Sequence, residues 1–157
     1  MQGVGCKNMN EALQHFKSVC EKEFNYLIEE YGFRSSPLPS GKFVNEFQFR
    51  LTNEVLTLVV EGISYGMDAM ISIQDNFGRS VSIGSLLPGW EPFAKRKRVK
   101  KKHQLNQDQQ IAQAAKQLKE HGQDVLGGNL ERFNNIGDRI NNIMSRFKDQ
   151  RNNQQSH

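Results

Sequence analysis

The feature that most constrains the fold of this chain is the spacing of its apolar residues, which changes twice along the sequence. From residue 10 to residue 31 apolar residues recur at steps of three and four, the period of an α-helix with one buried face. Between Phe43 and Ile83 the period is two, which is typical of strands with one face in water. From residue 104 onward the helical spacing returns. The sequence therefore predicts helix, then strands, then helix again.

The middle segment is expected to hold four strands, at residues 43–51, 55–62, 67–73 and 81–83. The connections between them are short and carry turn residues, such as Thr52-Asn53 after the first strand and Gly62 and Gly66 in the second connection. Connections of this length join antiparallel neighbours, because parallel neighbours need a long crossover. The sequence therefore predicts an antiparallel meander.

Three amphipathic helices flank the meander. The first is expected at residues 10–31, with Asn10 as its N-cap and Gly32 as its stop, and the second at residues 104–121. The third is expected to follow the cap Asn129. A meander with one face in water must cover its other face, and these helices carry the available apolar stripes. The expected fold class is α+β: an antiparallel four-stranded meander covered on one face by an N-terminal helix and two C-terminal helices.

A chain of 157 residues buries enough surface to form one domain without disulfide bonds. We expect a flexible N-terminal tail at residues 1–9, a single α+β domain at residues 10–148 and a disordered C-terminal tail at residues 149–157. Glycines, prolines and a run of cations predict an irregular basic loop at residues 84–103 within that domain. The longest apolar stretch, residues 55–60, is far too short to span a bilayer, so no membrane insertion is expected.

The net charge of +4 comes from one short segment. Residues 1–94 carry 7 basic and 11 acidic side chains, whereas residues 95–102 (KRKRVKKK) carry seven basic side chains and no acidic one. Such a run suits the phosphates of a nucleic acid or another polyanion. The polyanion-binding residues in this interpretation are Lys95, Arg96, Lys97, Arg98, Lys100, Lys101 and Lys102. The alternative is a solvated loop, since no aromatic residue is interleaved with the run for base stacking.

Acidic residues are frequent on and around the predicted strands. Those expected on the wet face and its adjoining turns are Glu46, Glu54, Glu61, Asp68 and Asp75. Together they predict an acidic surface suited to a basic protein partner. The alternative is that they are ordinary solvated positions of strands and turns.

Catalytic, metal and cofactor sites are not expected. The four histidines are dispersed, and no pair has the i, i+4 spacing of a metal site on a helix. Cys20 lies on the apolar stripe of the first helix, where a thiol is normally inert. Two unpaired cysteines, and residues 1–8 without an apolar signal segment, predict a cytoplasmic protein. A small enzyme with a site assembled from scattered residues is the remaining alternative.

Several segments of the chain resemble a group of small bacterial proteins. They are FNYLIEEYGF, FQFRLTNEVLTLVVEG, MDAMISIQD, SIGSLLP and LKEHGQDVLGGNLERFNNI. The group is that of the immunity proteins encoded beside polymorphic or contact-dependent toxins, with their uncharacterised relatives. The shared outline has an opening helix that ends in an aromatic-Gly-Phe corner (Tyr31-Gly32-Phe33), strands with alternating hydrophobic residues, and a late helix before a turn at Leu126 to Asn129.

The resemblance implies a non-catalytic cytoplasmic protein that binds a toxin domain, and it identifies no contact residues. It omits residues 88–103 and both ends of the chain. It departs from the group at Gly128-Asn129, where the group often carries Gly-Asp, and the basic run has no counterpart in it. The expected function is therefore a non-enzymatic protein-binding module of the immunity-protein kind. Binding of nucleic acid or another polyanion through residues 95–102 is the alternative.

Overall fold

The computed structural model describes residues 4–38, 41, 44–93 and 104–155. Within these ranges the chain forms a five-stranded sheet whose strands lie in sequence order, with every neighbouring pair antiparallel. The strands are β1 (Arg34–Ser35), β2 (Gln48–Thr52), β3 (Leu56–Ile63), β4 (Asp68–Asp75) and β5 (Ser80–Ser82). The predicted α+β class and the antiparallel meander are confirmed.

The prediction of four strands is wrong by one. The additional strand is β1, in which Arg34 pairs with Thr52 and Ser35 pairs with Leu51 along the edge of β2. Two residues are too few to show an alternating pattern, and the proline-rich segment around Pro37 indicated a loop instead. The chain therefore enters the sheet directly after its N-terminal helices.

The first predicted strand began at Phe43, whereas β2 begins at Gln48. Phe43 itself lies outside the described residues. The cause of the later start is Asn45, whose Oδ1 accepts a hydrogen bond from the backbone N–H of Phe47 (3.0 Å) and whose Nδ2 donates to the carbonyl of Gly62 (2.9 Å). A side chain thus takes up backbone groups that a strand would use for its ladder.

One face of the sheet carries the core. Leu56, Leu58 and Val60 of β3 point to this face and are buried. Their cross-strand neighbours are buried as well: Leu58 lies opposite Ile73 of β4, and Val60 lies opposite Phe49 of β2. Full burial of such a side chain contributes about 1.5–3 kcal/mol. The alternation read from the sequence therefore fixes which face of the sheet is covered.

The predicted first helix is divided in two. Helices α1 (Val4–Glu23) and α2 (Asn25–Tyr31) meet at Phe24, whose φ of −102° and ψ of 10° interrupt the helix while its ring stays buried. Helix α1 also begins before the predicted cap Asn10, so the predicted N-terminal tail at residues 1–9 is helical from its fourth residue. No proline interrupts that segment, and a helix that has nucleated extends until something stops it.

Two predicted helix ends are confirmed. Gly32 follows α2 in the left-handed conformation (φ 70°), which glycine adopts without strain, and its N–H donates to the carbonyl of Leu27. At the start of α5 (Glu131–Gln155), Oδ1 of Asn129 accepts the N–H of Glu131 at 3.2 Å. The residues chosen from the sequence as cap and stop therefore act as such.

The C-terminal helices are longer and more numerous than predicted. Helix α3 (Gln107–His121) starts with a capping box formed by Asn106 and Gln109, and the one-turn helix α4 (Gln123–Leu126) follows it. Helix α5 continues to residue 155, so the predicted disordered tail at residues 149–157 is helical as far as it is described. That segment contains no glycine or proline to end the helix.

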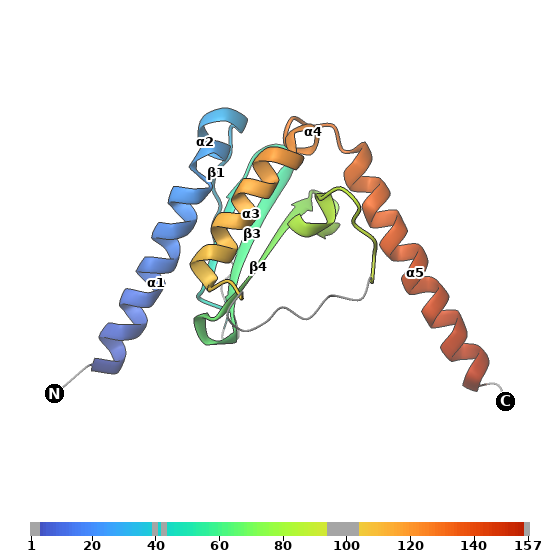
Figure 1. Ribbon diagram of the computed structural model, residues 1–157, viewed down its shortest axis with the longest axis horizontal. Helices are drawn as coiled ribbons and strands as arrows, with labels where there is room; N and C mark the ends of the chain where they lie inside the picture. Colours follow the sequence, from blue (N-terminus) through green and yellow to red (C-terminus); the bar gives the residue numbers. More distant parts are fainter. Residues whose placement is uncertain (1–3, 39–40, 42–43, 94–103, 156–157) are drawn as a thin grey trace.

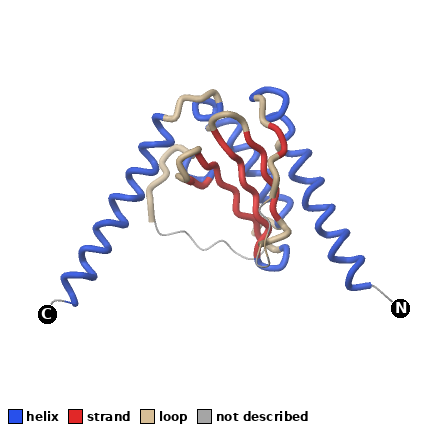
Figure 2. The backbone as a smooth tube through the Cα atoms, turned by 180° about the vertical axis from the view of Figure 1, so that it is seen from behind, coloured by secondary structure: helices blue, strands red, loops and turns tan. Residues whose placement is uncertain are grey.

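The helices do not all cover the sheet as predicted. In Figure 1, α3 lies across the core face in contact with β4, and α1 lies beside it in contact with α3 and β2. Figure 2 shows the opposite face with no helix in front of the strands. Helix α5 contacts β5 at the sheet edge and then leans away from the body. Within the described ranges, no helix is both long and apolar enough to cross a membrane.

Gly62 lies at a close approach between β3, the start of α3 and the segment before β2. A Cβ atom on Gly62 would stand 2.8 Å from Nε2 of Gln107 and 3.1 Å from Cβ of Phe47. Gly62→Ala is therefore expected to lower the free energy of unfolding by about 1–3 kcal/mol, as measured by urea denaturation.

The matched control for this substitution is Gly84→Ala, because a Cβ there meets nothing within 4 Å. We expect the control to change the free energy of unfolding by less than about 0.5 kcal/mol. Equal effects at Gly62 and Gly84 would contradict the close packing described for Gly62.

Candidate functional site

The five acidic residues of the predicted partner surface lie at two ends of the sheet. Glu54 precedes β3 and Asp75 ends β4, which places both at one end. Glu61 and Asp68 flank the β3–β4 connection at the other end, and Glu46 precedes β2 on that side. Strand β3 lies between the two groups, and its 8 residues extend roughly 25 Å. The structure therefore does not gather the five carboxylates into one patch.

Three of these carboxylates have partners within the chain. Oε1 of Glu61 accepts a hydrogen bond from Nε2 of Gln48 (3.0 Å), and Oδ1 of Asp68 accepts one from Nε2 of Gln110 in α3 (3.0 Å). Asp75 accepts two backbone N–H groups of the β4–β5 turn. The remaining two carboxylates are exposed. Part of the predicted acidic surface therefore serves to hold turns and neighbouring strands together.

The predicted polyanion-binding residues, 95–102, lie outside the described residues. The structure does place the residue that comes shortly before them. Phe93 has a left-handed φ of 61°, and its ring meets that of Phe147 in α5 edge to face, with 6.1 Å between the ring centres. The basic run therefore begins, in sequence, two residues after a side chain that contacts α5.

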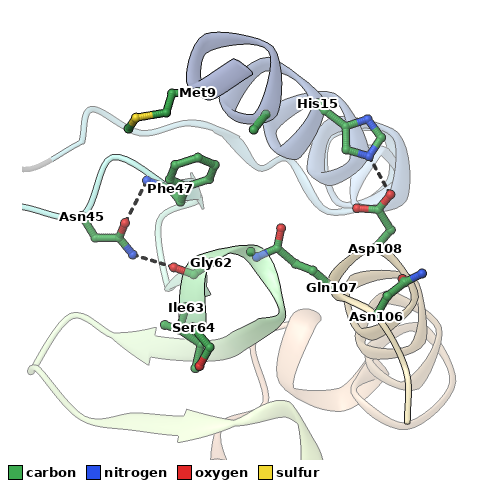
Figure 3. A pocket seen from close by; sticks show the side chains of 12 residues that line it. Met9, His15, Asn45, Phe47, Gly62, Ile63, Ser64, Asn106, Gln107 and Asp108 are labelled. Atoms are coloured by element: carbon green, nitrogen blue, oxygen red, sulfur yellow. Dashed lines mark hydrogen bonds and ion pairs between the residues drawn. The ribbon is translucent and has the colours of Figure 1, made fainter. Parts of the chain in front are cut away.

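A cavity of about 820 Å³ opens between α1, the β3–β4 connection and the first turn of α3 (Figure 3). A volume of this size is typical of small-molecule sites, which span roughly 300–1,000 Å³. Its apolar lining is formed by Met9, Ala12, Phe47 and Ile63. Its polar side chains are those of His15, Asn45, Ser64, Asn106, Gln107 and Asp108.

The main polar side chains of the cavity already have partners. Nε2 of His15 lies 2.6 Å from Oδ2 of Asp108, a contact that joins α1 to α3. Gln107 is buried, and its Nε2 donates to the carbonyl of Asp68 at 2.9 Å. The His15 and Asp108 side chains are 63% and 45% exposed, so their ion pair contributes at most about 1 kcal/mol. The cavity therefore has few free polar groups to orient a ligand.

A His–Asp pair is also part of the arrangement that activates a nucleophile in many hydrolases. Ser64 lines the same cavity, but in Figure 3 its side chain points away from His15, and no hydrogen bond joins these two described residues. In the part of the chain that the structure describes, no three His, Cys, Asp or Glu side chains are grouped to hold a metal ion. Among the residues that the structure describes, no hydroxyl or thiol is hydrogen-bonded to this pair.

Cys20 is buried on the core side of α1. Burial, assisted by the nearby carboxylates of Asp108 and Glu21, raises the pKa of its thiol from 9.0 to about 12. The thiolate is the nucleophilic form, and at neutral pH this thiol is fully protonated. Cys20 is therefore a packing residue.

The outer half of α5, residues 139–155, carries a second candidate surface. Its apolar residues Ile140, Ile143, Met144 and Phe147, here called the outer stripe, recur at steps of three and four. They continue the side by which α5 packs on the sheet edge. Yet Met144 is 54% exposed and Phe147 is 47% exposed. The apolar side of α5 therefore extends beyond the surface that it covers.

The loop that follows the short helix η2 (Ile83–Leu86) runs beside the outer half of α5. The guanidinium of Arg139 lies over the ring of Trp90, 5.6 Å from its centre, and pairs with the carboxylate of Glu91 at 2.7 Å. Phe93 then meets the outer stripe and is itself 60% exposed. The loop thus adds an aromatic side chain to the exposed apolar surface of α5.

Arg132 anchors the start of α5 to the body. Its guanidinium donates to the carbonyl of Leu86 (2.9 Å), to the carbonyl of His121 and to the carboxylate of Asp124 (2.6 Å). Burial raises the pKa of Asp124, but the hydrogen bonds and charge of Arg132, together with backbone hydrogen bonds, outweigh burial and lower that pKa. Two of these acceptors are backbone carbonyls, which have no signature in the sequence, so the sequence analysis missed this residue.

Two other features of the candidate surfaces were missed for different reasons. The contact between His15 and Asp108 joins residues 93 positions apart, and no spacing rule relates them. The helical spacing of the apolar residues after Asn129 predicts that the outer stripe packs on the sheet, whereas the structure leaves Met144 and Phe147 exposed. A signal against that interpretation was present, since polar and charged residues occupy every position after Phe147.

We expect the Cys20 thiol to resist iodoacetamide at mildly alkaline pH while the chain is folded, and to react once the chain is unfolded in denaturant. The reason is its pKa of about 12 in the folded chain. Peptide mass mapping measures the modified fraction at Cys20. Because this pKa is raised from 9.0, the contribution of the protonated thiol to stability is complete below pH 9 and is lost as the pH rises toward 12. Equal modification of folded and unfolded chain would contradict the burial of Cys20.

Comparisons with known proteins give no match: no protein-family model fits the chain, and neither the curated proteins nor the solved structures include a significant relative. The function of this chain is therefore inferred from its own surfaces.

Proposed function

We propose that this chain is a non-enzymatic protein-binding module and that its contact surface is the outer stripe of α5 together with Phe93. The observation that supports this most is the exposure of the outer stripe, which reaches 54% at Met144 and 47% at Phe147. Contiguous exposed apolar side chains with polar borders mark interaction sites on soluble proteins. Ile140 packs against the core and Ile143 is partly buried, so Met144 and Phe147 are the members of the outer stripe that the chain leaves exposed.

The energetics of α5 favour a partner. Residues 141–155 are exposed apart from the partly buried Ile143, so the body gives this segment little support. A helical segment of that length is marginal by itself in water. A partner that covers the outer stripe removes apolar surface from water, which is worth about 25 cal/mol per Å². The contacting rings of Phe93 and Phe147 supply rigid anchors for such a contact.

In its specific form the proposal makes the partner a toxin domain, as the resemblance to immunity proteins implies, and places the chain in the cytoplasm. An inhibitor of this kind acts by covering a surface of its target and needs no catalytic group of its own. The exposed carboxylates of Glu46 and Glu54 stay predicted contacts for a basic region of such a partner, one at each end of the sheet.

The contact surface is tested by replacing Met144 and Phe147 together with glutamate. Charges placed on an apolar contact are expected to weaken capture of a specific protein from native lysate by at least about tenfold, which corresponds to about 1.4 kcal/mol. The immobilised full chain is the bait, and quantitative mass spectrometry measures the captured proteins.

The matched control replaces Asn142 and Ser145 with glutamate, which adds the same charge at the same spacing on the other side of α5. This control is expected to capture the same protein as the wild type. If both double variants retain every protein that the wild type captures, the outer stripe is not the contact surface.

One observation favours a second candidate function, the binding of nucleic acid or another polyanion. The basic run at residues 95–102 follows Phe93, which contacts α5, and the outer half of α5 carries the exposed cations Arg146, Lys148 and Arg151. The run is thus joined to a surface that is already cationic. Several phosphate contacts by such a run give a steep dependence of affinity on salt.

This second candidate is tested by replacing the seven cations of residues 95–102 with glutamine. If they bind a polyanion, the wild type should shift single-stranded or duplex DNA in a gel with a log-log salt slope of order −6, and the variant should not. Replacing the exposed Lys22 and Lys116 with glutamine is the control for a general loss of charge. Equal affinity of wild type and seven-site variant at low salt eliminates this function.

A further inference from the structure

The charges beside the outer stripe indicate the charge that a partner surface should carry. At 3.6 residues per turn, Arg139 and Arg146 lie along one side of the stripe, Lys148 lies along the other, and Arg151 follows the stripe at its outer end. Arg139 is paired with Glu91. The other three cations are exposed and make no ion pair with any described residue. The outer stripe is therefore an apolar face with cations on both borders.

The acidic residues of this part of α5 do not neutralise those borders. Asp138 and Asp149 both lie on the side of the helix opposite the outer stripe. Asp138 is also 3.4 Å from a guanidinium nitrogen of Arg79, beside the β4–β5 turn. A surface that meets the outer stripe therefore meets positive charge and no negative charge from α5.

Neither a second copy of this chain nor its own residues 95–102 would complement the charge of this surface. A second copy that paired stripe against stripe, in either orientation, would bring cationic borders together, and like charges at such positions destabilise helix pairs. The neighbouring segment of the same chain, residues 95–102, carries seven cations and a single apolar residue, Val99. Neither offers the negative charge that the borders of the outer stripe lack.

The length of the outer stripe favours a protein partner over a membrane or a nucleic acid. Beyond Phe147 the same side of α5 carries Arg151 and Gln154, so the apolar face is only about two turns long. Its anchors follow the i, i+3/i+4, i+7 pattern of a helix that docks in a groove of another protein. A helix that lies on a membrane has a longer apolar face, and phosphate contacts leave an apolar stripe unused.

We infer that the outer half of α5 docks as a helix into a groove of a different protein, and that this groove has an apolar floor and an acidic rim. The outer stripe meets the floor, while Arg146, Lys148 and Arg151 meet carboxylates on the rim. This inference rests on the proposed function and adds the chemistry of the partner surface to it.

The test places a photo-crosslinking amino acid, p-benzoylphenylalanine, at Met144 of the full chain in its native cells. Ser145, which faces away from the outer stripe, is the control position. We expect one protein adduct at position 144 and none at position 145, with the crosslinked partner segment rich in Asp and Glu. Arg146→Glu with Arg151→Glu is expected to reduce the adduct at least tenfold.

The matched control for this charge reversal is Lys22→Glu with Lys116→Glu, which changes the net charge equally on α1 and α3 and is expected to leave the adduct intact. A protein adduct that survives reversal at Arg146 and Arg151, or a partner segment without carboxylates, overturns the acidic rim and leaves the proposed function standing. An adduct to a second copy, to lipid or to nucleic acid, or no adduct at position 144, overturns both. Circular dichroism confirms that each variant is folded.

Discussion

The packing of α3 on the core face of the sheet is the interaction on which the rest of the structure depends. The apolar side of β3 and β4 has to leave water, and α3 covers it with buried residues such as Ile111 and Leu118. Two side-chain amides fix the position of the helix: Gln107 donates to the carbonyl of Asp68, and Gln110 accepts the N–H of Ala69. The start of α3 then borders the cavity, and its end leads through α4 to α5.

The parts of the fold that could be predicted are those that follow from local rules. Alternation at Phe49 and Leu51 predicts the core face of the meander, and Gly32 and Asn129 predict helix ends, because the signal and its consequence lie within a few residues of each other. The late start of β2 could not be predicted, because it depends on a side chain, Asn45, that bonds across to Gly62. Of the candidate site, the apolar pattern of the outer stripe was visible, but its exposure depends on where α5 leaves the body.

The open face of the sheet and the outer stripe of α5 are both uncovered. They differ in whether their side chains have hydrogen-bond partners. On the open face of the sheet, Nε of Arg50 donates to Gln48 (3.2 Å), Gln48 donates to Glu61, and Thr52 shares a hydrogen bond with Thr57 (3.0 Å). These polar side chains bond one another, although Met70 on the same face is apolar and 59% exposed. The outer stripe has no such compensation, since an apolar side chain in water gains nothing from its neighbours there. Covering the outer stripe therefore removes more apolar surface from water than covering these polar side chains of the sheet would.

The position of Trp90 has a consequence for spectroscopy. It is the only tryptophan of the chain, and it lies beneath Arg139 where the body ends and the outer half of α5 begins. An indole beside a cation reports on that cation's position through its emission. Trp90 also packs against the hydrophobic core, so its fluorescence reports on the joint between the body and α5 together with the part of the core beside it.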